Sequence, residues 1–264
     1  MRKILIFVAS GFSTRMGGFP KALAEVDGTP VIIHALNRAE GYYDHVYIVC
    51  NGHTLQAFSE AVGKHGCDVA VRAIVTGKGD AESVWKSLSL IEKETGEAFD
   101  CTFCWGDAYF ATPEAFRGMM NPRIRIGEIH SILVGCSIDA DPYAYFDFRT
   151  TDGNMERMEI CHSYFRKRDG AVLLGMHDQC IFRCVSSVFL SCLDKYREAL
   201  GFDGENYRLS TNGEMGLLDS FSFLPEIGRP ASIRLLPPNN VFSFNTAEEL
   251  QQINESLLDK NSKA

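Results

Sequence analysis

The sequence contains no run of apolar residues close to the ~18 that a membrane-spanning helix needs. It also has no excess of basic residues, because 26 Lys and Arg are set against 34 Asp and Glu, which gives a formal net charge of -8. Proteins that bind nucleic acid or anionic membranes rely on basic surfaces, so we expect neither of these as a main partner. A local basic pocket for a small phosphorylated ligand is compatible with this charge.

The nine cysteines form no disulfide pattern, because their number is odd and they are spread thinly from Cys50 to Cys192. This distribution is typical of a reducing compartment, and we expect a cytoplasmic protein. Cys101 and Cys104 have C-x-x-C spacing, but their segment has the pattern of a strand, in which the two side chains would face opposite ways. We therefore interpret them as buried thiols and expect no metal site built from sulfur.

The opening segment has no polar residue between positions 4 and 8, where it reads ILIFV. Such a run predicts a strand buried on both faces of a parallel sheet. The strand leads into Ala9, Ser10 and Gly11 and then into a glycine-rich loop that carries two cations, Arg15 and Lys21. Free backbone N–H groups at the carboxyl edge of a sheet bind nucleotides in α/β proteins, so we expect residues 9–11 to bind a nucleotide.

Two common glycine-rich motifs are missing from this loop. The dinucleotide fingerprint G-x-G-x-x-G fails, because Ser13 and Met16 stand where the second and third glycines after Gly11 should be. The P-loop fails as well, because Ala22 stands after Lys21 where Ser or Thr would hold magnesium. These mismatches exclude the two commonest phosphate-binding motifs.

Residues 9–23 instead resemble the signature A-[AG]-G-x-[GS]-[ST]-R-M-G-x-x-P-K-x-L of the nucleotidyltransferase superfamily with a Rossmann-like fold. This superfamily includes sugar-phosphate nucleotidylyltransferases and the NTP transferases related to molybdenum-cofactor guanylyltransferase. The matching positions are Ala9, Ser10, Gly11, Ser13, Thr14, Arg15, Met16, Gly17, Pro20, Lys21 and Leu23. The continuation EVDGTPVIIHAL is similar to the V-x-G-[KT]-P-[LVI]-x-x-x-x-L segment of the same superfamily. The alternative is an ordinary surface loop with an incidental arginine and lysine.

The first half of the chain alternates between strand and helix patterns. Strands are predicted at residues 4–8, 45–50, 67–73 and 99–105, and helices at 30–40, 55–64 and 81–93. This order predicts right-handed crossovers and an α/β fold with a mostly parallel, Rossmann-like sheet flanked by helices.

The second half has a different pattern, in which strand and helix segments do not alternate regularly. Strands are predicted at 132–138, 143–150 and 171–184, and helices at 187–200 and 213–226. The resemblance implies one domain over residues 1–264, in which the NTP-binding half covers 1–120 and an acceptor-binding elaboration of the sheet covers 121–240. Residues 241–264 would form a closing segment and a C-terminal helix.

The resemblance also implies roles for individual residues. Arg15 and Lys21 would be catalytic and bind the β- and γ-phosphates, and Gly79 and Ser83 would contact the base or ribose. Asn51 ends a predicted strand within reach of a nucleotide, although a turn formed by Asn-Gly explains it equally well. Oligomeric state and the identity of the nucleobase stay open.

A magnesium site is expected at the end of the fourth strand. Asp107 follows Gly106 there, and a carboxylate at the carboxyl end of a central strand is a suitable Mg²⁺ ligand. The alternative is that Asp107 caps the next short helix. The resemblance places a second metal or phosphate contact at Asn245, just before Thr246 and Glu249, which have the spacing of a capping box.

Glu214 lies in a stretch reminiscent of N-x-E-x-x-L-x-D in the members of the superfamily that act on sugars, which suggests an acceptor contact. An amphipathic helix with an acidic start explains that stretch equally well.

The expected reaction is transfer of a nucleoside monophosphate from an NTP to a phosphorylated small-molecule acceptor, such as a sugar 1-phosphate, with release of pyrophosphate. One alternative is a cytidylyltransferase that acts on a polyol or amino-alcohol phosphate. A non-catalytic nucleotide-binding regulatory module is an alternative of another class. A sugar transferase with a D-x-D metal motif is a further alternative, but its pattern occurs at residues 139–141, away from the fourth strand.

Overall fold

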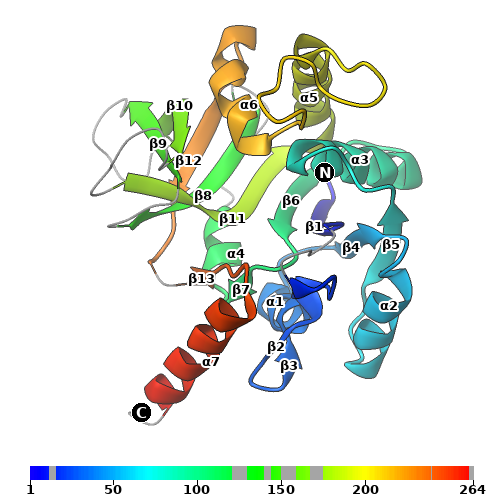
Figure 1. Ribbon diagram of the computed structural model, residues 1–264, viewed down its shortest axis with the longest axis vertical. Coiled ribbons are helices and arrows are strands. Elements are labelled where there is room, and N and C mark those ends of the chain that lie inside the picture. Colours follow the sequence, from blue (N-terminus) through cyan, green and yellow to red (C-terminus); the bar gives the residue numbers. More distant parts are fainter. Residues whose placement is uncertain are drawn as a thin grey trace.

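The computed structural model describes residues 1–11, 16–120, 130–139, 144–149, 159–166, 175–238 and 240–261. A nine-stranded sheet runs through the middle of the molecule and has helices on both faces (Figure 1). From one edge to the other its strands are β5 Ala70–Ile74, β4 His45–Asn51, β1 Lys3–Ala9, β6 Asp100–Trp105, β11 Gly175–Val185, β8 Ile132–Asp139, β12 Ala231–Leu235, β10 Glu159–Arg166 and β9 Ala144–Arg149.

Strand directions divide this sheet into a parallel part and a mixed part. β1 pairs in parallel with β4 and β6, and β4 pairs in parallel with β5. Beyond β6, strand β11 is antiparallel to both β6 and β8, β12 is parallel to β8, and β10 is antiparallel to β12 and β9. Within this sheet β10 and β11 therefore run against the other strands. The predicted α/β fold with a mostly parallel sheet is confirmed.

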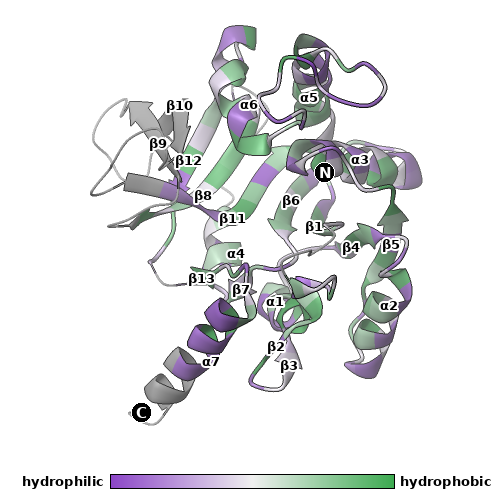
Figure 2. Cartoon of the chain, viewed as in Figure 1, coloured by the Kyte–Doolittle hydropathy of each residue, from purple (hydrophilic) through white to green (hydrophobic). Residues whose placement is uncertain are grey.

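Strand β1 contributes side chains to two hydrophobic cores, because its successive side chains point to opposite faces of the sheet. Ile4, Ile6 and Val8 belong to one core, whereas Leu5 and Phe7 belong to the other. The helices that cover the first core are α3 Asp80–Thr95, α5 Ser186–Leu200 and α6 Leu217–Phe223. Those that cover the second are α1 Val31–Ala39, α2 Leu55–Lys64 and α4 Glu114–Met119. Figure 2 shows hydrophobic residues concentrated along β6 and β8 and hydrophilic residues along α7.

The remaining short elements bring the last part of the chain back to the first half. They are the 3-10 helices η2 Lys21–Leu23 and η4 Leu224–Ile227, the strands β2 Glu25–Val26, β3 Thr29–Pro30, β7 Tyr109–Phe110 and β13 Val241–Phe242, and the helix α7 Ala247–Asn261. β13 pairs antiparallel with β7. Ile253 of α7 packs with Val26 and Phe244 in a third small core. This packing fixes the segment that precedes α7 beside the loop after β6.

Two element boundaries differ from the sequence-based predictions for a local reason. The strand expected at 67–73 begins at Ala70, because the Cys67 N–H still donates to Val62 O of the preceding helix, at 3.2 Å. The helix expected at 213–226 begins at Leu217, because Gly213 has a φ of +74° and the Asn212 side chain accepts the Glu214 N–H in a turn. The predicted helix start was therefore wrong, although the helix exists.

Other differences concern the second half. β10 and β12 were not predicted from the sequence. The strand expected at 143–150 is present as β9, with residues 143 and 150 outside the described residues. The strand expected at 171–184 is present as β11 from Gly175 onward, and residues 171–174 lie outside the described residues.

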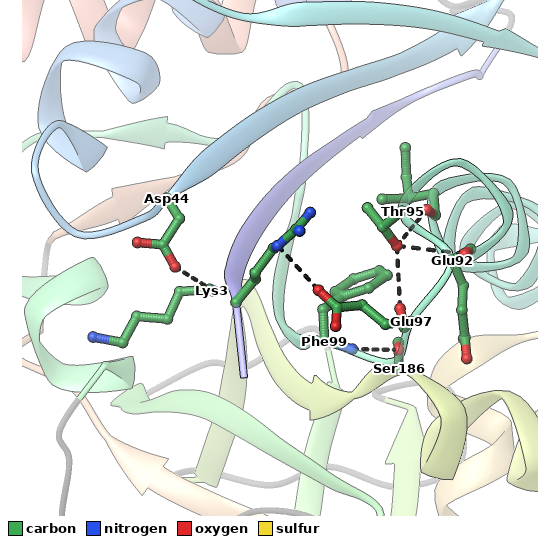
Figure 3. Close-up of polar contacts among 9 residues, drawn as sticks. Lys3, Asp44, Glu92, Thr95, Glu97, Phe99 and Ser186 are labelled. Carbon is green, nitrogen blue, oxygen red and sulfur yellow. Dashed lines mark hydrogen bonds and ion pairs between the residues drawn. The ribbon is translucent and has the colours of Figure 1, made fainter.

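Polar contacts hold the amino-terminal edge of the sheet (Figure 3). The Phe99 N–H donates to Ser186 Oγ at 3.0 Å, which ties the start of β6 to the start of α5. The Lys3 N–H donates to the Asp44 carboxylate at 2.8 Å beside the start of β4. These contacts lie at the edge opposite to the loops that follow β1 and β6.

Cysteine side chains are buried or half-buried as free thiols at each of the eight positions in the part of the chain with described side chains. Cys101 packs in the core under α3 and α5, and Cys104 packs in the core under α1 and α4. The prediction that these two side chains face opposite ways is confirmed. Among the described helices, none is long and apolar enough to cross a membrane.

A buried ion pair joins the two halves where β11 meets β6. Arg183 donates through Nε and Nη2 to the two carboxylate oxygens of Asp100, at 2.8 and 2.6 Å. Its Nη1 donates to the Met119 carbonyl oxygen at 2.8 Å. The side chains of Arg183 and Asp100 are only 8% and 17% exposed. This two-pronged geometry satisfies both charges inside the protein.

We expect Arg183→Met to lower the free energy of unfolding by about 3–5 kcal/mol, because it leaves the Asp100 carboxylate buried without its partner. Urea denaturation at pH 7 measures this loss. Arg72→Met is the matched control, because the Arg72–Glu94 ion pair lies at the exposed edge of the sheet, with side chains 40% and 31% exposed. Exposed pairs of this kind contribute about 0–1 kcal/mol, so equal losses in the two variants would contradict the prediction.

Candidate functional site

A cavity of about 490 Å³ lies where the carboxyl ends of the parallel strands meet. Its walls come from the loop after β1, from η2, from the loop between β5 and α3, and from the end of β6. The connection from β1 leads to β4 on one side of it, whereas the later connection from β5 crosses back to β6 on the other side of β1. Ligands in α/β proteins bind at such a switch point.

Three side chains from distant parts of the sequence converge at one side of this cavity. Lys21 Nζ donates to Asp107 Oδ2 and to Asn245 Oδ1, each at 3.1 Å. Lys21 and Asp107 are partly enclosed, with side chains 16% and 33% exposed. The structure therefore brings together one predicted phosphate-binding cation and both predicted metal ligands, in a position open to a ligand.

Glycine and a helix cap determine where the two oxygen ligands stand. A Cβ on Gly106 would lie 2.7 Å from Ala9 Cβ, so only glycine lets the end of β6 pass this close to β1 and present Asp107. The start of α7 presents Asn245: Thr246 Oγ1 accepts the Glu249 N–H at 3.2 Å, and the Glu249 carboxylate accepts the Asn245 N–H. The predicted cap is confirmed. The α4 helix begins only at Glu114, so the alternative role of Asp107 as its cap is wrong.

The loop after β1 is tied to two neighbouring loops through one carbonyl oxygen. Ser10 O accepts hydrogen bonds from Thr76 Oγ1 at 3.0 Å and from Asn51 Nδ2 at 3.4 Å. Asn51 is buried, and its Oδ1 accepts the Thr54 N–H at 3.1 Å in the turn after β4. Asn51 thus holds the loop after β1 in place through this hydrogen bond, while Ala9, Ser10 and Gly11 line the cavity.

The loop between β5 and α3 forms another wall of the cavity, with Gly79 and Ser83 among its lining residues. Gly79 has a φ of +101°, and a Cβ there would collide with Met215 O. Main-chain hydrogen bonds hold this loop against the second half: Met215 N donates to Lys78 O at 2.7 Å, and Ala81 N donates to Met215 O at 3.0 Å. The second half therefore sets the position of a loop in the first half.

Asp80 begins α3 and is an exposed residue that lines the cavity. Its Oδ1 accepts the N–H groups of Ala81 at 2.9 Å and of Leu217 at 2.7 Å. Desolvation by the surrounding protein raises the pKa of Asp80 from 3.8 to about 6, and the nearby charge of Asp219 raises it further against the lowering effect of these hydrogen bonds. This carboxylate therefore titrates close to neutral pH.

A bulge in β11 lies next to the Lys21–Asp107 pair. Cys180 in this bulge has a φ of +56°, and its N–H donates to Asp178 Oδ1 at 3.0 Å. Burial raises the pKa of the Cys180 thiol, and the neighbouring charges of Asp178 and Asp107 raise it further, whereas Lys21 lowers it. The second half of the chain thus reaches the same edge of the sheet as Asp107.

Four predicted site residues are not among the described lining residues of this cavity, namely Arg15, Asn51, Glu214 and Asn245. Arg15 lies outside the described residues, so its role stays a prediction. Glu214 lies exposed in the turn before α6, where its carboxylate accepts a hydrogen bond from Asn212 Nδ2 at 3.1 Å. No cluster of three or more His, Cys, Asp or Glu suited to a metal exists among the residues that the structure describes.

Sequence reasoning missed Thr76, Trp105 and Asp80 as lining residues. Trp105 ends the predicted strand 99–105, Thr76 follows the predicted strand 67–73 by three residues, and each directly precedes a glycine. The rule that placed Asp107 at the carboxyl edge could therefore have found them. Asp80 was interpreted only as a possible helix-start residue.

Comparison with known proteins agrees with this geometry. Residues 5–129 match the family described as a MobA-like NTP transferase domain. The bifunctional protein GlmU of Cereibacter sphaeroides is 27% identical over 157 residues, which cover 58% of this chain and 33% of GlmU. The 2-C-methyl-D-erythritol 4-phosphate cytidylyltransferase of Chlorobaculum tepidum is 30% identical over 99 residues, or 36% of this chain and 40% of that enzyme. The chain thus spans about a third of the length of GlmU.

Solved structures share the fold over nearly the whole chain. A UDP-glucose pyrophosphorylase bound to UDP-glucose has a TM-score of 0.68 at 13% identity, covering 98% of this chain and 99% of that one. The inositol-1-phosphate CTP transferase from T. maritima has a TM-score of 0.64 at 15% identity, with 97% of each chain covered. At these identities the likeness establishes the fold. Residues 5–129, slightly less than half of the chain, are thus similar to the MobA-like NTP transferase domain, and the whole chain shares its fold with solved nucleotidyltransferase structures.

Proposed function

We propose that the protein transfers a nucleoside monophosphate from an NTP to a phosphorylated small-molecule acceptor and releases pyrophosphate. The observation that carries this proposal is the convergence of Lys21, Asp107 and Asn245 at the nucleotide-sized cavity. A purely structural contact would not require three polar residues from distant segments to meet beside an open cavity. The same convergence argues against a non-catalytic binding module.

The acceptor phosphate is itself the nucleophile in this reaction. One of its oxygens forms a bond to the α-phosphorus of the NTP while the bond between that phosphorus and the β-bridging oxygen breaks, and pyrophosphate leaves with the electron pair. Alignment and neutralisation of charge matter most for such a displacement, so no covalent intermediate with the protein is needed. Lys21 would stabilise the negative charge that grows on the leaving pyrophosphate. Arg15 would assist from the same loop.

The donor set fits a magnesium ion. Asp107 Oδ2 and Asn245 Oδ1 are both oxygens, which Mg²⁺ prefers, and both contact the same lysine nitrogen, so they lie close to one another. Mg²⁺ binds through one or two protein oxygens together with substrate phosphates, which matches a site with few protein ligands. When bound, the ion would neutralise phosphate charge and orient the α-phosphate.

A sugar 1-phosphate or a polyol phosphate is the proposed class of acceptor. The bulge of β11 supports entry of the acceptor from the second half, because it lies beside Asp107. The names of the similar proteins include transferases that use a sugar, inositol 1-phosphate or an erythritol phosphate. Pyrophosphate release, measured for each of the common NTPs with a panel of phosphorylated sugars and polyols, tests the proposal. Absence of release with every combination would overturn it.

Lys21→Ala is expected to lower turnover by about 10²-fold or more, because the ammonium acts mainly on charge that develops in the transition state. Steady-state pyrophosphate release measures the change. Lys64→Ala is the matched control, since Lys64 is exposed at the end of α2, away from the cavity. Unchanged turnover of a folded Lys21→Ala protein would remove Lys21 from this role.

Asp107→Asn is expected to raise the magnesium concentration for half-maximal rate by about tenfold or more, because a neutral amide replaces the anionic ligand. A magnesium titration at saturating NTP measures this shift. Asp44→Asn removes a carboxylate at the opposite edge of the sheet, where it accepts the Lys3 N–H, and serves as the control. Identical magnesium curves for the wild type and Asp107→Asn would contradict the metal assignment.

A further inference from the structure

The two sides of the cavity differ in charge, and this difference bears on the choice of nucleobase. The side formed by β6 and η2 holds Lys21 and Asp107, whereas the side formed by the β5–α3 loop holds Asp80 and Ser83. In the sheet β5 and β6 are separated by β4 and β1, three strand spacings or roughly 14 Å. Besides burial, which raises the pKa of Asp80 most, Asp219 is the charged side chain that raises it. A nucleotide with its phosphates at Lys21 would therefore place its base near Asp80.

Asp80 is held as a fixed hydrogen-bond acceptor. Both Ala81 N–H and Leu217 N–H donate to its Oδ1, from the starts of α3 and α6. Within the described part of the chain, its Oδ2 has no hydrogen-bond donor, and Asp80 is an exposed residue that lines the cavity. Gly79 and Met215 fix the backbone just before it. The carboxylate thus has one oxygen committed to the fold and one oxygen open to a ligand.

An ionised carboxylate accepts hydrogen bonds and donates none. Cytosine, adenine and guanine carry an exocyclic amino group on their pairing edge, whereas uracil and thymine carry two carbonyl oxygens on either side of a single ring N–H. A carbonyl oxygen facing the Asp80 carboxylate would leave two acceptors opposed without a proton between them. A base with an amino group would satisfy the open oxygen.

We propose that Asp80 selects the donor nucleotide by accepting a hydrogen bond from an exocyclic amino group of its base, so that the protein takes a cytosine, adenine or guanine nucleotide in preference to a uracil or thymine nucleotide. This inference rests on the proposed function, because it assumes that the cavity holds an NTP. It adds a specificity-determining residue to a site for which the nucleobase was open.

Matched nucleotide pairs test the inference by binding alone. CTP and UTP differ by an amino group against a carbonyl oxygen, ATP and ITP differ in the same way, and GTP and ITP differ by the 2-amino group. Isothermal titration with Mg²⁺ and without acceptor should give at least one pair in which the amino base binds about 10- to 100-fold more tightly, the range expected for a hydrogen bond to a charged group. UTP and dTTP should bind weakly.

Asp80→Asn is the decisive variant, because an amide keeps an oxygen for Ala81 and Leu217 but also offers an N–H donor to a carbonyl oxygen. The preference within the selected pair should fall by about tenfold or more in this variant. Asp219→Asn is the matched control, since it removes the neighbouring charge on α6 without altering the lining of the cavity, and it should keep the preference. Equal binding of the paired nucleotides to the wild type would overturn the inference.

The stability of the variant can be checked independently. The pKa of Asp80 is higher in the folded protein than the ordinary 3.8 of an unfolded chain. The contribution of Asp80 to the free energy of unfolding is therefore fully present below pH 4 and is lost as the pH rises through about 6. Removing this titration should therefore leave Asp80→Asn at least as stable as the wild type at pH 8. A urea melt at pH 8 tells a binding effect from unfolding.

Base preference should also depend on pH. The groups that face Asp80 are Asp219 of α6 and Tyr196 of α5. Burial raises the pKa of Tyr196, and the charges of Asp219 and Asp80 raise it further, so Tyr196 stays neutral. Protonated Asp80 could donate to a carbonyl oxygen, so the preference for the amino base should shrink between pH 7.5 and pH 5.5, on either side of the Asp80 pKa of about 6, and stay level in Asp80→Asn. Protonation of the phosphates cancels within each pair.

Three results separate the two proposals. Binding of every NTP with equal affinity overturns the selection by Asp80 and leaves the proposed function standing. Pyrophosphate release with a clear preference for amino bases that survives in Asp80→Asn assigns the selection to another residue and also overturns it. Absence of binding by any NTP overturns both.

Discussion

The parallel pairing of β1 with β4 on one side and β6 on the other is the constraint on which the rest of the structure depends. A strand hydrogen-bonded on both sides and buried on both faces has no freedom of position, so its last residue is a fixed point. Ser10 follows directly, and its carbonyl oxygen accepts hydrogen bonds from Asn51 at the end of β4 and from Thr76 after β5. These bonds fix the neighbouring segments relative to β1. The cavity is thus the meeting place of loops whose positions are set from one strand.

Only a few polar side chains stand at the side of the cavity where the phosphates are proposed to bind. The Lys21 ammonium lies between two oxygens that come from a strand end and from a helix start, and each of these is held by a local device. Gly106 permits the close passage of β6 beside Ala9, and the cap of α7 orients Asn245. Gly106 and the α7 cap take no part in the proposed chemistry, but they set the positions of Asp107 and Asn245, which do.

The sequence predicted the first half of the fold well because its signals there are local. The apolar run of β1, the helical spacing of α3 and the glycines that end the strands each depend on a few neighbouring residues. Lys21, Asp107 and Asn245 were identified as candidates through their motifs, and the rule that parallel strands end at one edge placed Asp107 beside the loop after β1. Asn51 has the turn role that the Asn-Gly dipeptide had indicated, and its contact with a nucleotide stays a prediction.

The second half was harder to predict because long-range pairing decides its elements. β12 lies between β8 and β10, and β8 separates it from β11, the strand of this sheet that precedes it in the chain. The start of α6 depends on a glycine turn that composition does not distinguish from a helix start. The position of the Asp80 carboxylate depends on a hydrogen bond from the Leu217 N–H. Leu217 is more than a hundred residues away in the sequence, so no local sequence pattern predicts this contact.

The ion pair between Arg183 and Asp100 limits how this chain can be divided or recombined. The residues that match the transferase family end before β11, so a fragment cut at that boundary would expose the long side of β6 as an open edge and leave Asp100 without its arginine. A chimera that exchanges the second half with that of a protein of similar fold would need a compatible pair of charged residues where β11 meets β6. The natural module for transplantation is therefore the whole sheet.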